Sequence, residues 1–230
     1  MTECELCRAI VAWVADLGWE VYQEVRPIQY GRVADLVCTQ DGIVWVIEGK
    51  VRFGFDVISQ AAHWVPDAHY VSVATPRGRQ RSGRVWSVER ACLGLYGLGW
   101  LRVDTDGAVR EDLAPRLNRH ALPRLREALC ESQKTQVEAG GNRGGYWTPF
   151  SETCRALLEY VRAHPGCLFG DAVRSIEHHY CSAATAKGSL RKWIGLGKVP
   201  GLCFDPDAPG RQLRLMETGA PEASGLRSPA

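Results

Sequence analysis

Apolar and polar positions along the first 131 residues follow two periods, one typical of helices and one typical of strands. Apolar side chains recur at intervals of three and four over residues 3–17 and stop at Gly18, which predicts a helix. Residues 19–25 alternate, and residues 33–39 and 43–48 are apolar runs, so we expect three strands to follow. The later expected elements are a helix at 56–65, a strand at 70–74, a helix at 85–96, a hairpin of 100–103 with 108–110, and a closing helix at 122–130. This order, α-β-β-β-α-β with additions, predicts an α/β fold.

The periodic pattern breaks twice, and the breaks divide the chain. Residues 132–145 are polar and Gly-rich and lack periodicity, which is typical of a flexible linker. The tail, residues 205–230, is rich in Pro, Gly, Ala and Ser, and we expect it to be disordered. Two folded units, 1–131 and 146–204, are therefore predicted. The second is expected to be small and mainly α, with helices at 150–163, 171–179 and 182–193 and a short strand at 199–204.

Composition narrows the class of protein. The chain has 230 residues, of which 45% are hydrophobic and 23% charged, as in globular proteins. No stretch approaches the roughly 20 apolar residues that span a bilayer, and the start lacks the pattern of a signal peptide. The nine cysteines are odd in number and scattered, so reduced thiols are expected. We therefore expect a cytoplasmic protein without a membrane partner.

Asp41 and Gly42 separate two of the apolar runs, and Asp-Gly between such runs is the strongest short signal of a β-hairpin. A two-residue turn at this dipeptide places Asp35 directly opposite Glu48 on one face of the hairpin. Lys50, two residues after Glu48, is expected on the same face. The other hairpin positions are apolar on both faces, which is typical of strands in the middle of a covered sheet.

Two carboxylates held together at the end of buried strands repel each other, and a divalent cation would offset that repulsion. Mg²⁺ suits such a site because it prefers oxygen ligands and keeps several waters for a phosphate substrate. Lys50 would be close enough to steer a water or an oxyanion. The alternatives are that the acids occupy solvated strand ends, or that a β-bulge shifts the register.

These residues resemble the motif of the PD-(D/E)XK nuclease superfamily, which has the restriction-endonuclease-like fold. The resemblance covers about residues 3–75 and rests on Glu24, Asp35, Glu48-Gly49-Lys50 and Gln60. It implies an αβββαβ core with a mixed central sheet and metal-dependent hydrolysis of phosphodiester bonds. The expected cofactor is Mg²⁺, with Mn²⁺ as a substitute.

The resemblance also implies a role for each matching residue. Asp35 and Glu48 would bind the metal, with the carbonyl of Gly49 as a third ligand. Lys50 would orient or activate the attacking water, and Gln60 would contact the site from the following helix.

Three further points qualify the match. Glu24, on the first strand, is a candidate further catalytic acid, and the alternative is a solvent-facing glutamate. Ala34 rather than Pro precedes Asp35, and Trp64 rather than Tyr lies four residues after Gln60. These departures leave the subfamily open.

The net charge is only +2 and does not by itself indicate a nucleic-acid-binding protein, but the distribution of the charges along the chain does. No acid lies between Glu177 and Asp205, and three helices plus a strand in this unit resemble a winged-helix-turn-helix domain. The alternatives are a protein-interaction or dimerisation module for this unit, and a solvated face for each cationic cluster. The candidate DNA-binding residues are Lys187, Arg191, Lys192 and Lys198 in this unit, and Arg77, Arg79 and Arg81, with Arg84, in the first.

The function that these features favour is a metal-dependent DNA endonuclease whose C-terminal unit targets DNA. One alternative is a DNA-binding regulator in which the nuclease fold is catalytically silent, and another is a nuclease acting on RNA. A cut through both strands would be simplest for a homodimer. Phage biology, restriction and repair all use this fold, so the fold does not choose the process.

Overall fold

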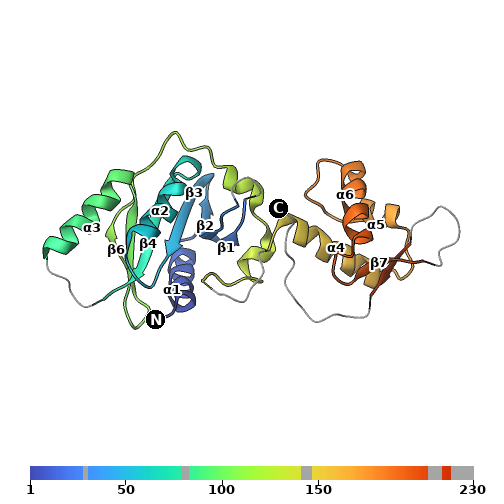
Figure 1. The fold of residues 1–230 in the computed structure, drawn as a ribbon, viewed down its shortest axis with the longest axis horizontal. Coiled ribbons are helices and arrows are strands. Elements are labelled where there is room, and N and C mark those ends of the chain that lie inside the picture. Colours follow the sequence, from blue (N-terminus) through green and yellow to red (C-terminus); the bar gives the residue numbers. More distant parts are fainter. Residues whose placement is uncertain (28–30, 79–82, 141–146, 207–213, 219–230) are drawn as a thin grey trace. The chain divides into compact units, whose positions relative to one another are not determined.

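A computed structural model describes the chain except residues 28–30, 79–82, 141–146, 207–213 and 219–230. The chain divides into two compact units, Met1–Gly144 and Gly145–Ala230 (Figure 1). Each unit has its own hydrophobic core. No helix in the described ranges is both long enough and apolar enough to cross a bilayer.

The first unit is built on a six-stranded mixed sheet with its strands in chain order. Strands β1 to β3 are antiparallel to one another, β3 to β5 are parallel, and β6 is antiparallel to β5. The strands are β1 (Glu20–Val25), β2 (Ala34–Gln40), β3 (Ile43–Gly49), β4 (Tyr70–Pro76), β5 (Gly99–Val103) and β6 (Val109–Leu113). The α/β class and the mixed sheet are as expected.

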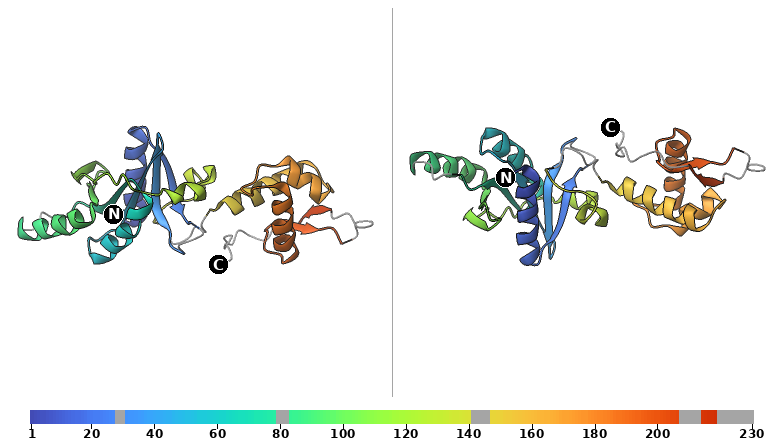
Figure 2. Two further views of the ribbon diagram at one scale, coloured as in Figure 1. Left: turned by 90° about the horizontal axis from the view of Figure 1, so that it is seen from above. Right: turned by 90° about the horizontal axis from the view of Figure 1, so that it is seen from below.

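Helices cover both faces of this sheet, because side chains that alternate along each strand are apolar on both sides. Helix α1 (Glu3–Asp16) packs on the face that carries Leu36 and Ile47. Helices α2 (Phe55–His63) and α3 (Gly83–Tyr96) pack on the other face, which carries Val37 and Val46. Figure 2 shows α1 and α2 on opposite sides of the strands.

The turn between β2 and β3 confirms the predicted hairpin. Asp41 and Gly42 have φ angles of 48° and 85°, as a type I′ turn requires. Gln40 pairs with Ile43, and the pairing continues in the predicted register to the end of the ladder.

The segment after β6 differs from the prediction. In place of a closing helix at 122–130, a short 3₁₀-helix, η2, spans Arg124–Ala128, with Leu125 and Ala128 buried three residues apart. A second, η3, spans Glu131–Lys134, inside the expected linker. Its Gln133 is fully buried and donates from Nε2 to the carbonyl of Ala128 at 2.9 Å. Residues 132–140 therefore belong to the first unit, because they bury side chains against it.

The second unit contains the three expected helices and a two-stranded sheet. Helices α4 and α6 begin after the capping side chains of Thr148 and Ser182. The expected disordered tail does not hold for residues 214–218, because Leu215 is fully buried and its strand pairs with the preceding one. The elements are α4 (Pro149–Ala163), α5 (Phe169–Ser175), α6 (Ala183–Gly195), β7 (Leu202–Phe204) and β8 (Leu215–Glu217).

Candidate active site

Three acidic residues lie in a row across three neighbouring strands. On β1 and β2, the pairs Gln23–Leu36 and Val25–Ala34 flank Glu24 and Asp35, so these two acids oppose each other. On β2 and β3, the last ladder pair is Leu36–Ile47, and the next residues outward are Asp35 and Glu48. The row Glu24, Asp35, Glu48 thus crosses one end of the sheet.

Asp35 and Glu48 are in direct contact, as the hairpin register predicts. Their carboxyl groups share a hydrogen bond, and Oδ2 of Asp35 also accepts the backbone N–H of Gly49 at 2.8 Å. Burial raises the pKa of Asp35 above its usual value. Burial, and then the Asp35 charge, raise the pKa of Glu48 well above its usual value. The pair therefore holds a proton in the range where separate carboxylic acids would be ionised.

An indole fixes the other side of Glu48. The Nε1–H of Trp64 donates to Oε1 of Glu48 at 2.6 Å, and the Trp64 side chain is almost wholly buried. Trp64 follows the last residue of α2, so this helix holds one oxygen of Glu48 while Asp35 holds the carboxyl from β2.

Lys50 follows β3 and reaches toward α1. Its backbone N–H donates to the carbonyl of Ala74 at 2.9 Å, and its Nζ lies 3.3 Å from Oε1 of Glu3. Desolvation alone would lower the pKa of Lys50, but the charges of Glu3, Asp35 and Glu48 raise it above its usual value. The amine therefore stays protonated and contributes positive charge to the acidic row. The prediction had placed it on the face of Glu48, whereas its ion pair is with the helix on the opposite face.

Glu24 is held in place by an unusual backbone and by the end of the first unit. Its φ angle is 52°, in the left-handed region that residues with a Cβ rarely occupy. Its Oε1 accepts the backbone N–H of Gly140 at 3.0 Å. Burial is the main cause that raises the pKa of Glu24 to about 7, and the Asp35 and Glu3 charges add to it. Glu24 is therefore a half-buried residue held beside Asp35, and its carboxyl group does not extend freely into solvent.

Gly49 leaves room for α1 to approach the acids. A Cβ at this position would lie 2.8 Å from Sγ of Cys7 and 3.8 Å from Oδ2 of Asp35. Only a glycine therefore lets the helix pack so close to this end of β3. Burial raises the pKa of the Cys7 thiol, with the Asp35 charge second, so this cysteine is an inert packing residue.

The donor chemistry of the row fits a hard divalent cation, because its side-chain donors are carboxylate oxygens and two of these carboxyl groups lie against each other. Asp35 and Glu48 are the residues that would hold such an ion, with Glu24 beside them. In the ranges that the structure describes, no three His, Cys, Asp or Glu side chains are grouped as a formed metal centre.

Gln60 does not join the acids directly. It lies on α2, half-buried, one helical turn before Trp64, and its side chain makes no hydrogen bond to Asp35 or Glu48. Trp64, at the position where the resemblance led us to look for a tyrosine, makes the contact instead.

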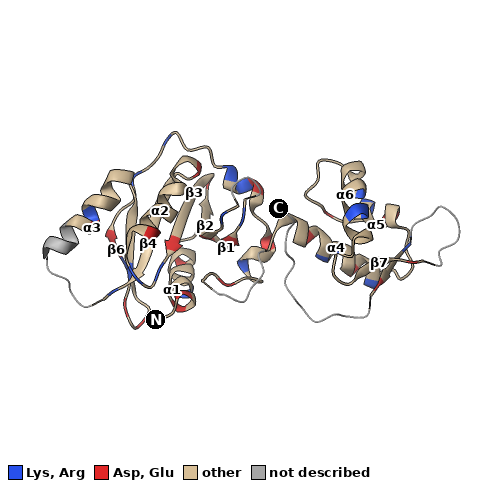
Figure 3. Ribbon diagram, viewed as in Figure 1, with Lys and Arg blue, Asp and Glu red and all other residues tan. Residues whose placement is uncertain are grey.

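The candidate DNA-binding cations have different environments. Arg77 is 3.2 Å from Asp104 in an exposed ion pair, and Arg79 and Arg81 lie outside the described residues. Lys187 is half-buried on α6, whereas Arg191, Lys192 and Lys198 are exposed. Figure 3 shows basic positions and no acidic ones along α6.

Three partners of the site were missed by sequence reasoning. Glu3 was missed, although it is the first residue of α1 and lies four residues before the buried Cys7. The helical period places these two side chains on the same face of the helix, so the sequence contained this signal. Trp64 was noted only as a departure from the motif. Gly140 carried no signal, because only folding brings it to Glu24.

Searches of family models, curated proteins and solved structures found nothing that matches this chain.

Proposed function

We propose that this chain is a metal-dependent DNA endonuclease of the PD-(D/E)XK type. The observation that carries the proposal is the row of Glu24, Asp35 and Glu48 on three adjacent strands, with Glu48 buried, the other two half-buried, and Lys50 at the end of the row. Burying several like charges is costly, so an arrangement that serves only stability would replace them with apolar residues. Strongly shifted pKa values clustered at one strand end are typical of functional sites.

Each residue has a role that follows from its contacts. Asp35 and Glu48 would hold Mg²⁺ or Mn²⁺, and bound there the ion would lower the pKa of water and stabilise charge on a phosphodiester. Trp64 and the amide of Gly49 keep the two carboxylates oriented. Lys50, protonated and partly exposed, would stabilise negative charge on the scissile phosphate.

The second unit would supply affinity for DNA. Its order of helices followed by a two-stranded sheet is compatible with a winged-helix-turn-helix domain, with α6 in the groove. Arg191 and Lys192 are exposed on α6, and an acid-free surface favours contact with phosphates. Lys198, just after this helix, would contact the backbone.

Cleavage assays test the proposal. Purified protein is incubated with duplex, single-stranded and flap DNA, and with RNA, in Mg²⁺, Mn²⁺ or EDTA. We expect metal-dependent cleavage that falls at least about 100-fold in Asp35→Asn and in Lys50→Ala. Asp41→Asn, which removes an exposed carboxylate from the same hairpin, is the matched control and should retain activity. Activity that persists in EDTA, or in both site variants, would overturn the proposal.

A second candidate, a DNA-binding regulator, is favoured by the ion pair between Lys50 and Glu3, which occupies the amine. Calorimetric titration with Mn²⁺ separates the two. Binding that is lost in Asp35→Asn supports the nuclease. Tight DNA binding without any carboxylate-dependent metal binding supports the regulator.

A further inference from the structure

The stretch between Lys50 and α2 is anchored at both ends. Lys50 is bound through its backbone to β4, and Phe53 packs on Trp100 with ring centroids 4.7 Å apart. Helix α2 then buries Val57 and Ile58 against the sheet. The residues between these anchors therefore have a defined position beside the acidic row.

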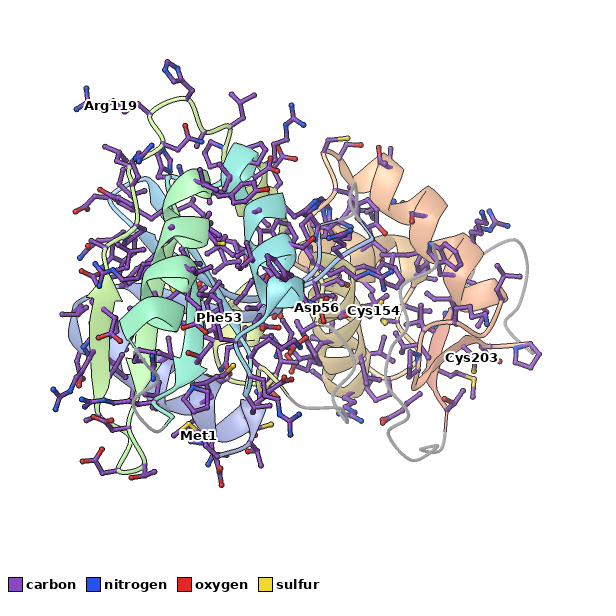
Figure 4. All side chains as sticks on the ribbon, turned by 60° about the vertical axis from the view of Figure 1, so that its left-hand side comes forward. Met1, Phe53, Asp56, Arg119, Cys154 and Cys203 are labelled. Atoms are coloured by element: carbon purple, nitrogen blue, oxygen red, sulfur yellow. The ribbon has the colours of Figure 1, made fainter. Side chains whose placement is uncertain are left out.

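Phe55, the first residue of α2, projects from this anchored stretch into solvent. Its side chain is 80% exposed, and of the five phenylalanines in the chain, all within the described ranges, it alone is exposed. Figure 4 labels Phe53 and Asp56, which lie on either side of it in the chain. Because the chain on either side of Phe55 is anchored, placing this ring on a flat partner costs little backbone freedom.

The charges around Phe55 indicate what kind of partner fits. Arg52 is exposed three residues earlier and makes no ion pair with a described residue. Asp56, the next residue in the chain, is exposed too, so a phosphate is favoured on the Arg52 side of Phe55 in the chain and disfavoured on the Asp56 side. An aromatic face beside a cation is the combination with which proteins bind single-stranded nucleic acid, whose bases can stack on it.

We propose that Phe55 stacks on an unpaired nucleobase of the strand that is cut, while Arg52 contacts its backbone; this deepens the proposed nuclease function and rests on it. The substrate class is a nucleic acid with a single-stranded stretch beside the scissile phosphate. A base inside a duplex already stacks on its neighbours and offers no free face. Phe55 comes five positions after Lys50 in the chain, a span of at most about 17 Å. The stacked base thus lies within about five nucleotides of the cut.

A binding experiment in EDTA tests this inference without any cleavage. The full chain is titrated, by fluorescence anisotropy, with a short single-stranded DNA, the matching duplex and an RNA strand of the same sequence. We expect Phe55→Ala to weaken single-strand binding by about 5- to 150-fold and duplex binding by less than about twofold. Phe55→Trp should restore the affinity. Leu95→Ala, which removes a side chain that is 81% exposed on α3, is the matched control and should change neither.

A 2-aminopurine moved along the DNA strand locates the stacked base. We expect quenching at one position that is lost in Phe55→Ala, within about five nucleotides of the site cut when metal is added. Equal effects of Phe55→Ala on single strand and duplex, or no effect on either, would overturn the inference. Comparing the titrations with single-stranded DNA and with RNA shows which of the two nucleic acids provides the stacked base. Absence of cleavage with metal would overturn only the nuclease function, because the stacking result is read without it.

Discussion

The indole of Trp64 and the carboxyl group of Glu48 form a buried hydrogen bond of 2.6 Å between the end of α2 and the end of β3. This bond leaves the second oxygen of Glu48 for Asp35 or for a metal ion. Contacts of this kind, one step away from a metal ligand, often set its affinity and orientation.

Trp64→Phe keeps an aromatic ring in the core and removes the donor. We expect metal affinity and cleavage rate each to fall by about 10- to 100-fold, because Glu48 loses its fixed orientation. Mn²⁺ calorimetry and cleavage assays measure the two effects. Trp45→Phe removes another buried indole donor, to Ser72, on the opposite face of the sheet from Trp64, and serves as the control. If both variants lose activity equally, the Trp64 bond only supports the fold.

The hairpin and its acid pair could be predicted from the sequence because their determinants are local. Asp41 and Gly42 require positive φ angles at two adjacent positions, and the turn then sets the register of every pair up to Asp35 and Glu48. The two turn residues and the turn type they require were therefore enough to predict that Asp35 and Glu48 lie opposite each other.

Other parts of the site could not be predicted because tertiary packing creates them. Gly140 is 116 residues from Glu24 in sequence, yet its amide holds that carboxylate. A Cβ on Gly140 would lie 2.7 Å from the backbone carbon of Glu3, so the segment fits tightly against α1. A Gly-rich stretch without periodicity predicts a linker, and nothing local marks the residues within it that pack.

Stability without metal should fall as pH rises. Burial raises the pKa of Glu24 from 4.5 to about 7, and the pKa values of Asp35 and Glu48 are also raised. A carboxyl group whose pKa is higher in the folded than in the unfolded state stabilises the fold when protonated, and this contribution is lost as pH rises through the folded value.

For Glu24 this places the loss between about pH 4.5 and 7. Urea unfolding in EDTA at pH 5, 6, 7 and 8 measures it, and Glu24→Gln should flatten the profile. Glu20 is an exposed acid on the same strand, and in Glu20→Gln the stability should still fall as pH rises. A midpoint that is constant or rises over this range in the wild type contradicts the assignment.

Close packing at Gly49 should make it intolerant of even one methyl group. A Cβ there would meet Sγ of Cys7 at 2.8 Å, so Gly49→Ala is expected to destabilise the protein by about 1–3 kcal/mol. In a Cys7→Ala background the same change should cost less, because the clashing sulfur is gone. Gly54→Ala, where a Cβ meets nothing within 4 Å, is the control. Urea unfolding of the four Gly49/Cys7 combinations measures the coupling, and additive costs would show that Cys7 is not the obstacle.

Binding of duplex DNA by the second unit should depend on salt through α6. Arg191→Ala with Lys192→Ala removes two exposed cations, and each lost phosphate contact lowers the slope of log affinity against log salt by about 0.9. We therefore expect a slope that is smaller by about 1 to 2, measured by anisotropy at several salt concentrations. Arg155→Ala removes a cation that Glu152 and Glu159 already neutralise on α4, and its slope should match the wild type. If the double variant keeps the wild-type slope, α6 does not contact the DNA backbone, and the targeting role of this helix fails independently of the catalytic site.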